Sequence, residues 1–544
     1  MVFLSVLLIS MFITIALIPL LMTLGSRFNL MDIPDERKVH ASPMPRTGGI
    51  AMALGAFIPV LFWAPADDFI RAVLIGGGIL VLSGLIDDWR NLDYKIKFAA
   101  QTAAALIVIF YGGVKITSLG MLLPEDMLLP DLLAVPLTVF VIVGVTNAIN
   151  LADGLDGLAG GISLLSFICL VYLAYGAEQT VMGVLAVAVA GSIFGFLRFN
   201  TYPAVVFMGD AGSQFLGFSA ITLSLGLTQG NTPLSPLLPL LILGFPVLDT
   251  LTVMLERLAE KKSPFFPDKK HFHHRLIRVG LSHTESVLVI YFLQACLIIS
   301  AIFFRFHSDW LLLILYVIFS GIVLAGFFLA DRTGWRFRRY NLLDKVIKGK
   351  LKALKENIII SVCFRGIEYG IPALLLFICI IPQDIPVLFS LLSLGLAALM
   401  AGAWFFKKKS FVGALRLALY VVIPLLIFQG ETGRPGWMSE WLTDIYNFIF
   451  VILVVFIMLT LRLSRRKAFK STPMDFLILF IALVVPNLPH EPVQNINMGL
   501  IAGKIIVLFF GYEVLIGELR GELNRLGLAT IAALAVLSVK GFII

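Results

Sequence analysis

Apolar stretches of about 20 residues recur along this sequence from its first residues to its last, and each is long enough to cross a bilayer core as a helix. The composition agrees, because 59% of the residues are hydrophobic and only 14% are charged; soluble globular proteins have about 45–50% and 25%. These values exclude a soluble enzyme, a disordered scaffold and a secreted disulfide protein. Long uninterrupted stretches also exclude a membrane β-barrel, whose strands are short and alternating. The sequence predicts an all-α polytopic membrane protein.

The predicted spans form two groups separated by a basic stretch at 331–356. About 11 spans form the first group, near 3–24, 48–64, 70–86, 98–113, 131–149, 157–176, 180–197, 212–228, 236–255, 285–304 and 310–330. About seven form the second, near 358–381, 386–405, 411–429, 446–462, 474–488, 498–516 and 528–544. We therefore expect a membrane domain over 1–330, a basic cytoplasmic linker over 331–356 that lies on the inner leaflet as an amphipathic helix, and a C-terminal membrane domain of unassigned role over 357–544.

Lysine and arginine set the predicted orientation, since they concentrate in cytoplasmic loops. With the N-terminus outside, most basic residues of the first group fall in inward loops, and the outward loops and edges carry only Arg71, Lys115 and Arg305. The same rule explains the net charge of +8, so we expect the lipid bilayer rather than a nucleic acid as the partner of this charge.

Clusters of polar residues at the ends of spans are informative in so apolar a chain, because such side chains are costly near hydrocarbon and usually face a cavity or a ligand. Five clusters occur, and the predicted topology places all of them on the cytoplasmic side. The first is the loop 32–49, where Arg37, Lys38 and Arg46 lie among acids, prolines and glycines. Its cations could receive phosphates; a solvated, positively charged loop is the alternative.

The second cluster is Asp87-Asp88, at the inner end of the span 70–86, with Lys97 nearby. Adjacent carboxylates repel, so both stay ionised most easily beside a cation or water. A metal site or a catalytic base is one interpretation, and a pair of solvated loop aspartates is the other.

The third cluster combines amides and acids with glycines over 147–161. Asn147, Asn150 and Asp153 are spaced by three residues, so the end of a helix would place them on one face. Asp156 follows one turn later. Carboxamide and carboxylate oxygens suit Mg²⁺ and its water shell, and the twelve-residue loop of an EF-hand is absent.

The last two clusters suggest phosphate binding. Gly209-Asp210-Ala-Gly212-Ser213 precedes a span and resembles an anion site at the start of a helix, with Asp210 placed to hold a metal ion. His271, His273 and His274 lie within four residues and next to lysines and arginines. Zinc is the rival ligand, but adjacent histidines point apart on a regular helix and no cysteine is near, so phosphate is favoured. The other histidines, His283 among them, are assigned no role.

A carboxylate site for a hard cation, together with cationic phosphate binders on one face, indicates phosphoryl transfer. ATP is not the expected donor, because the sequence contains neither a P-loop nor the kinase motifs.

The five clusters, in this order, resemble the polyprenyl-phosphate N-acetylhexosamine-1-phosphate transferase superfamily, in its WecA/TagO-like branch. The matching segments are Pro34-Asp-Glu-Arg-Lys-x-His40 with Pro45-Arg-x-Gly-Gly, Asp87-Asp88, Asn147-x-x-Asn-x-x-Asp-Gly-x-Asp-Gly, Phe207-Met-Gly-Asp210, and His271-Phe-His-His274. The related MraY branch has three consecutive histidines instead. The resemblance covers about residues 1–330.

The resemblance implies transfer of a sugar-1-phosphate, with GlcNAc-1-phosphate expected, from a UDP-amino sugar to undecaprenyl phosphate, with release of UMP. It implies Mg²⁺ as cofactor, with Mn²⁺ as the alternative ion, and a multi-pass enzyme of the bacterial inner membrane that begins a cell-surface polysaccharide. Asp210, with Asp153, would hold the metal ion. Asp87 or Asp88 would deprotonate or orient the lipid phosphate.

The same resemblance implies a substrate-binding role for the remaining motif residues. Phosphates, the nucleotide sugar and the metal's second shell would be contacted by Lys97, Asn147, Asn150, Asp153, Asp156, His271, His273 and His274.

Two departures from the family pattern stand out. Phe272 replaces the usual isoleucine, and residues 331–544 lie outside the resemblance. In that second half we expect Arg365 and Glu368 to pair, and expect structural roles for Arg416, Lys504 and Glu513. The alternatives are an MraY-like enzyme that takes a UDP-linked muramoyl-peptide and a transporter of lipid-linked sugars.

Overall fold

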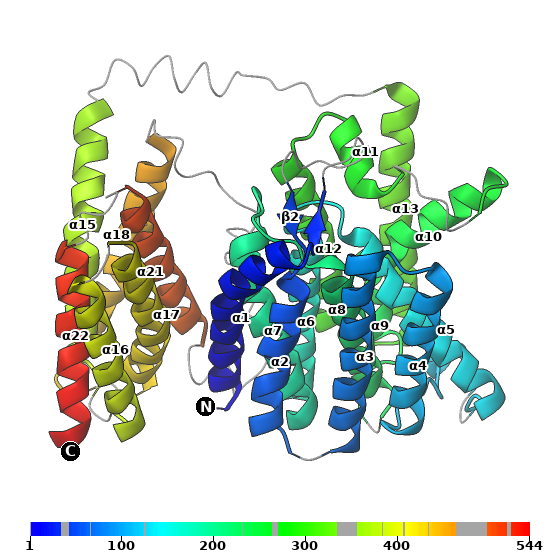
Figure 1. Cartoon of the computed structure of the whole chain (residues 1–544), viewed down its shortest axis with the longest axis horizontal. Helices are drawn as coiled ribbons and strands as arrows, with labels where there is room; N and C mark the ends of the chain where they lie inside the picture. The colour runs from blue at the N-terminus through cyan, green and yellow to red at the C-terminus, as the bar shows by residue number, and fades with distance from the viewer. Residues whose placement is uncertain are drawn as a thin grey trace. The chain divides into compact units, whose positions relative to one another are not determined.

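The computed structural model describes residues 2–33, 43–65, 67–124, 127–230, 232–263, 270–334, 356–382, 385–405, 408–432, 435–463, 498–518 and 524–543. These residues are helical apart from loops and one two-stranded antiparallel sheet (Figure 1). The all-α prediction is thereby confirmed. The chain divides into two compact units, Met1–Arg338 with Thr472–Leu477 and Arg339–Ser471 with Ile478–Ile544. Most of the expected linker helix, 335–355, lies outside the described residues.

The first unit contains thirteen α-helices among the described residues. They are α1 (Val2–Arg27), α2 (Gly48–Trp63), α3 (Asp68–Arg90), α4 (Tyr94–Phe110), α5 (Asp131–Ala152), α6 (Leu158–Gly176), α7 (Thr180–Asn200), α8 (Gly209–Thr228), α9 (Leu238–Ile242), α10 (Gly244–Ala259), α11 (Phe272–Arg278), α12 (His283–Phe303) and α13 (Asp309–Thr333). A 3-10 turn, η1 (Gly120–Leu122), and a hairpin of β1 (Met31–Asp32) and β2 (Met44–Pro45) complete it.

Each predicted span coincides with helix, except 474–488, which lies outside the described residues. One prediction was wrong in detail: the span 236–255 is interrupted at Leu243, where α9 ends and α10 begins. In the described part of the chain, nine helices are long and apolar enough to cross a bilayer. The protein is thus a multi-pass membrane protein, and the total of 18 spans stays a prediction.

Helix α8 is the central element of the first unit, because it packs against α2, α3, α5, α6, α7 and α9 and is buried along nearly its whole length. Four of its hydroxyls, those of Ser213, Thr222, Ser224 and Thr228, donate to its own backbone; the Thr222 hydroxyl, for example, donates to the Phe218 carbonyl oxygen over 2.7 Å. Such bonds satisfy polar groups where no water is present.

Close glycine contacts set the position of the first turn of α8. A Cβ on Gly49 of α2 would come within 2.2 Å of the Gly212 nitrogen, and a Cβ on Gly84 of α3 within 2.4 Å of the Ala211 nitrogen. Only glycine allows the backbones to approach so closely. The first turn of α8 is therefore held between α2 and α3.

The segment before α8 is also tied to the β-hairpin. The Phe207 nitrogen donates to the Pro45 carbonyl oxygen over 2.8 Å, and the Gly48 nitrogen donates to the Phe207 carbonyl oxygen over 2.9 Å. In Figure 1 the hairpin and α11 lie at the same end of the first unit. The polar clusters predicted from the sequence meet at this end.

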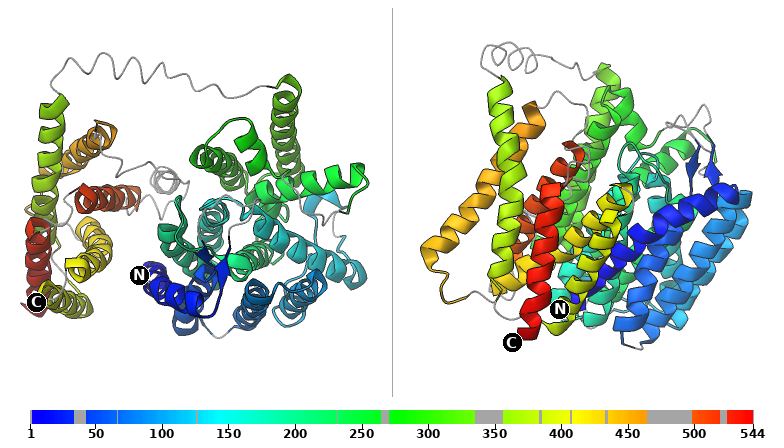
Figure 2. Two further views of the ribbon diagram at one scale, coloured as in Figure 1. Left: turned by 45° about the horizontal axis from the view of Figure 1, so that its top comes forward. Right: turned by 60° about the vertical axis from the view of Figure 1, so that its left-hand side comes forward.

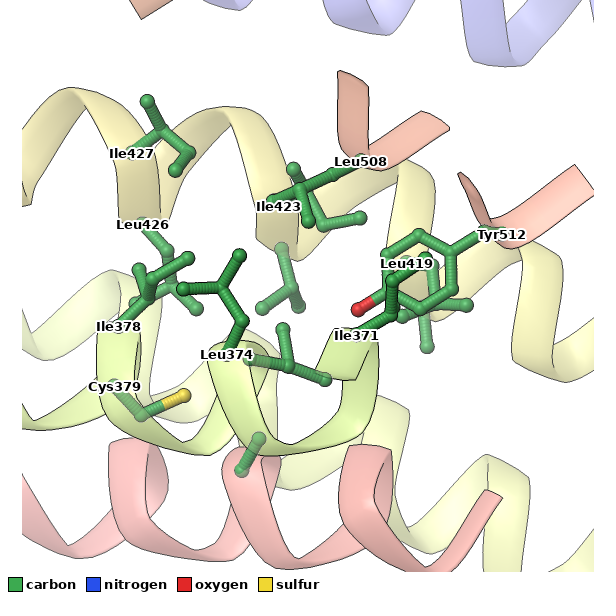
Figure 3. Packing of buried hydrophobic residues seen from close by; sticks show 14 of the residues in the cluster. Ile371, Leu374, Ile378, Cys379, Leu419, Ile423, Leu426, Ile427, Leu508 and Tyr512 are labelled. Atoms are coloured by element: carbon green, nitrogen blue, oxygen red, sulfur yellow. The ribbon is translucent and has the colours of Figure 1, made fainter. Parts of the chain in front are cut away.

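The second unit contains α15 (Glu356–Ile380), α16 (Val387–Phe405), α17 (Lys408–Thr432), α18 (Glu440–Leu463), α21 (Met498–Glu518) and α22 (Asn524–Ile543). These helices pack side by side, α16 against α22 and α15 against α18 (Figure 2). Their core is apolar: Leu374 and Ile378 of α15 lie close to Leu419 and Ile423 of α17 (Figure 3).

Charged residues of the second unit form specific pairs. The expected pair of Arg365 and Glu368 was wrong, because the Glu368 carboxylate lies 3.0 Å from the Arg525 guanidinium of another helix. Lys504 pairs with Glu431, and both side chains are almost fully buried. The Lys504 ammonium also lies 3.9 Å from the centre of the Tyr446 ring, so Lys504 has the structural role expected of it. The side chains of Arg416 and Glu513 lie outside the described part.

We expect Lys504→Met to destabilise the protein by about 3–5 kcal/mol, because it breaks a buried ion pair with Glu431. The double variant Lys504→Met/Glu431→Leu should recover most of this loss. Arg525→Met, which breaks a solvent-exposed pair, is the control and should cost about 0–1 kcal/mol. Thermal unfolding of the purified protein in detergent checks this order, and equal losses in Lys504→Met and Arg525→Met would contradict it.

Candidate active site

A cavity of about 350 Å³ lies in the first unit, next to the start of α8. Its walls come from the loop before α2, the end of α3, the α5–α6 loop and the starts of α8, α11 and α12. All five predicted clusters contribute, since the lining includes Asp32, Arg46, Asp88, Asn150, Asp153, Asp156, Asp210 and His274. The structure therefore brings together residues that lie up to 251 positions apart in the sequence, Asp32 and His283.

Lys97 links two carboxylates beside the cavity. Its ammonium lies 2.5 Å from Oδ2 of Asp87 and 3.0 Å from Oδ2 of Asp210. The other oxygen of Asp87 accepts a hydrogen bond from the Leu92 nitrogen over 2.7 Å. One cation thus stabilises the close approach of the end of α3 to the start of α8, where two carboxylates alone would repel.

Asp88 holds the first turn of α8. Its two carboxylate oxygens accept from the Asp210 and Ala211 nitrogens over 3.2 and 3.4 Å, a favourable place for a negative charge because the dipole of a helix is positive at its N-terminus. Arg46 lies 3.5 Å from Asp88 and also pairs with Asp32. Gly209 has φ +65°, and a Cβ there would meet the Asp88 carboxylate at 2.2 Å, so this position requires glycine.

The two asparagines of the third cluster have different surroundings. Asn150 lines the cavity, and its amide donates to the Ser213 hydroxyl over 3.0 Å. Asn147, one turn earlier, donates to Oε1 of Gln101 over 2.7 Å and is not among the lining residues of the described cavity. Gln101 in turn donates to Gln214 over 3.2 Å. Asn147 therefore supports the site from behind.

The loop between α5 and α6 carries Asp153 and Asp156 into the cavity wall. Oδ2 of Asp156 accepts from the Ala204 nitrogen over 2.9 Å, and the Gly157 backbone bonds to the side chains of Asn200 and Tyr291. Burial raises the pKa of Asp153 to about 7; the negative charges of Asp210, Asp156 and Asp32 add to this effect, while Arg46 opposes it. The cavity lining contains five aspartates and one arginine, so acidic side chains outnumber cations there.

The three histidines of the fifth cluster differ in their surroundings: one lines the cavity and two are buried behind it. His274 lines the cavity. His273 is buried, and a Cβ on Gly154 would come within 2.3 Å of its Nε2 atom. Burial, reinforced by His274 and His271, lowers the pKa of His273 well below its usual value, so this ring is neutral at pH 7. His271 is also buried and contacts Asp249. We therefore place His271 and His273 behind the cavity wall, as supports.

Comparisons with known proteins identify relatives of this chain. Residues 70–228 match the model of glycosyl transferase family 4. The probable undecaprenyl-phosphate N-acetylglucosaminyl 1-phosphate transferase of Bacillus subtilis (strain 168) is 36% identical over 346 residues, which are 63% of this chain and 96% of that protein. The chain belongs to glycosyl transferase family 4.

Two further family members extend the comparison. The undecaprenyl-phosphate alpha-N-acetylglucosaminyl 1-phosphate transferase of Escherichia coli (strain K12) is 30% identical over 61% of this chain and 90% of its own length. The decaprenyl-phosphate N-acetylglucosaminephosphotransferase of Mycolicibacterium smegmatis is 34% identical over 49% of this chain and 73% of its own length. The resemblance inferred from the sequence motifs is confirmed.

The sequence argument missed two residues in and behind this glycosyl transferase site, Asp249 and His283. Arg46 was expected as a phosphate-binding cation, but its pairing with Asp88 is visible only in the fold. Asp249 is the lone acid of the span 236–255, and a lone carboxylate in an apolar span could have drawn attention to it. His283 lines the cavity and its ring lies 4.6 Å from the Tyr202 ring; no motif pointed to it.

The donor groups fit a magnesium ion better than a zinc ion. Among the described residues, no three histidine, cysteine or acidic side chains form a complete metal site, which a structural zinc ion would need. Magnesium commonly takes only one or two protein carboxylates, with water and substrate phosphates as its remaining ligands. Asp210 and Asp153 line the same cavity, together with three further aspartates.

Proposed function

We propose that this protein transfers GlcNAc-1-phosphate from UDP-GlcNAc to undecaprenyl phosphate and releases UMP. One observation carries the proposal. The start of α8 brings together Asp87, Asp88, Lys97 and Asp210, and the cavity beside it is lined by residues from all five predicted clusters. The relatives support it, because the names of those in Bacillus and Escherichia describe this group and this lipid.

The cavity suits the diphosphate of a nucleotide sugar. Arg46 lies at its wall and Lys97 beside it, and both can neutralise phosphate oxygens. Asn150, Asp156 and His274 provide hydrogen-bonding groups around the same space. We assign the recognition of the UDP-amino sugar to these residues. Asn147, His271 and His273 lie behind the cavity lining, and we assign them the role of holding the lining residues in place.

Asp210 and Asp153 would hold Mg²⁺, or Mn²⁺ as the alternative. A bound divalent ion would neutralise the phosphate oxygens so that a second phosphate anion can approach. Asp87 and Asp88 adjoin this point from the end of α3. We assign to this pair the deprotonation or orientation of the lipid phosphate, and alignment of the two substrates then supplies much of the rate.

The cellular setting follows from the same proposal. The protein lies in the bacterial inner membrane with its N-terminus outside and the cavity on the cytoplasmic side, where UDP-sugars are made. Its product, a lipid-linked amino sugar, is the first membrane intermediate of a cell-surface polysaccharide. The second unit is accessory to this chemistry in the proposal, since each of the five motifs lies in the first unit.

A donor panel tests the proposal. We expect the purified full-length protein, with undecaprenyl phosphate and Mg²⁺, to release UMP from UDP-GlcNAc faster than from UDP-GalNAc, UDP-glucose or a UDP-linked muramoyl-peptide. Coupled detection of UMP gives the rates. Preference for the muramoyl-peptide would favour the MraY-like alternative, and no UMP from any donor would contradict the proposal.

A further inference from the structure

Asp249 is a buried carboxylate that none of the five motifs contains. It lies in α10 with 4% of its surface exposed. Oδ1 accepts from the Phe272 nitrogen over 2.8 Å, and Oδ2 lies 3.0 Å from Nδ1 of His271. An ionised carboxylate can only accept hydrogen bonds, so Nδ1 of His271 carries the proton. Asp249 thereby fixes both the start of α11 and the orientation of the His271 ring.

A continuous series of contacts connects this pair with the cavity. The rings of His271 and His273 are parallel, with their centres 5.9 Å apart, and the rings of His273 and His274 are 4.2 Å apart. His273 packs against Gly154 in the loop that carries Asp153 and Asp156. His274 itself lines the cavity. A displacement of His271 would therefore change the position of groups in the cavity wall.

The contact of α11 with α10 does not depend on Asp249 alone. The Arg275 guanidinium lies 2.5 Å from the Glu256 carboxylate on the same pair of helices, and the Phe245 and Phe272 rings pack with their centres 5.7 Å apart. An apolar residue at position 249 would avoid the cost of a buried carboxylate. Because these other contacts also hold α11 on α10, the Asp249 carboxylate is best explained by its specific effect: it sets where α11 begins and how the His271 ring is oriented.

We propose that Asp249 is a positioning residue for the donor side of the reaction, acting through His271 on His273, His274 and the Asp153–Gly157 loop. This inference rests on the proposed function. The carboxylate keeps one tautomer of His271 and one placement of α11, as an acid that orients a histidine does in other enzymes. It touches neither substrate.

The test compares Asp249→Asn with the full-length wild type. Asparagine has nearly the same size and can still accept from the Phe272 nitrogen, but it no longer offers a charge to His271. We expect kcat/KM for the UDP-sugar to fall about 10–100-fold, with KM for the polyprenyl phosphate and the unfolding temperature unchanged. Asp309→Asn is the matched control: Asp309 is equally buried, accepts from the Met121 nitrogen and from Ser235, and lies outside the cavity lining.

A double-variant cycle adds a second readout. If Asp249 acts through His271, the double variant Asp249→Asn/His271→Gln should be as active as the less active of the two single variants. Wild-type rates in Asp249→Asn, additive losses in the double variant, or a loss that follows only the unfolding temperature would each overturn the inference while the proposed function stands. A wild-type protein that releases no UMP overturns both.

Discussion

Asp210→Asn is expected to lower kcat about 10³-fold, the largest effect of any single substitution in this protein. Asp210 is in the first turn of α8, and its carboxylate is contacted by Lys97 of α4 and Asn150 of α5, while its backbone nitrogen donates to Asp88 of α3. Asparagine keeps the size of the side chain but removes the charge that would hold Mg²⁺. Release of UMP at saturating donor and acceptor measures the loss, and chelation of divalent cations should abolish the wild-type rate as well.

Asp131→Asn is the control for this variant. Asp131 is also in the first turn of a helix and also pairs with a lysine, Lys115, over 2.5 Å, but its side chain is 78% exposed and it lies outside the cavity lining. We expect its rate to equal that of the wild type. An Asp210→Asn protein that is folded and as active as Asp131→Asn, or full activity of the wild type in chelator, would contradict the assignment of Asp210 to the metal ion.

Lys97→Gln is expected to have the second-largest effect, a fall in kcat of about 10²-fold. Lys97 is the cation between Asp87 and Asp210, so its removal leaves two carboxylates facing one another and deprives the diphosphate of a positive charge. Binding of Mn²⁺ should persist or become tighter, because Asp210 loses the cation that competes with the metal ion. Steady-state kinetics, with Mn²⁺ binding followed by electron paramagnetic resonance, separates the two effects.

Lys115→Gln provides a closely matched comparison. The side chains of Lys97 and Lys115 have nearly equal exposure, 30% and 29%, and each lies 2.5 Å from an aspartate. Lys115 contacts one carboxylate outside the cavity lining, so its loss should leave both kcat and Mn²⁺ affinity unchanged. Equal activity of the two variants would show that Lys97 has no part in phosphate binding or in the arrangement of the acids.

Much of the site could be predicted from the sequence, because its residues are polar groups at the ends of apolar helices. Several helix ends in this unit lie close together, so Asp87 and Asp210 both contact Lys97 although they are 123 positions apart in the sequence. The prediction of α8 as a span with an acid at its start needed only the hydrophobic pattern and the glycines. The helices and their polar ends can be predicted because each depends on the composition and periodicity of one short stretch of sequence.

The remaining features depend on contacts between distant segments, which a single sequence does not reveal. Asp88 is adjacent to Asp87, yet its oxygens accept from the backbone of α8 while Asp87 contacts Lys97. Glu368 lies one turn from Arg365 but pairs with Arg525, since helix packing brings that residue nearer. The three histidines likewise differ in burial because α11 packs with one side against α12 and against Phe245 and Asp249 of α10.

The fate of the β-phosphate tests the central claim most directly. UDP-GlcNAc labelled with ³²P at the β-phosphate should be incubated with the full-length protein, undecaprenyl phosphate and Mg²⁺, and the organic and aqueous phases then separated. The proposed reaction predicts that the label moves into the lipid at a rate equal to UMP release. The Asp210→Asn protein should neither transfer the label nor release UMP. Label that stays in the aqueous phase as UDP, while the sugar reaches the lipid, would show transfer of the sugar alone and contradict the account.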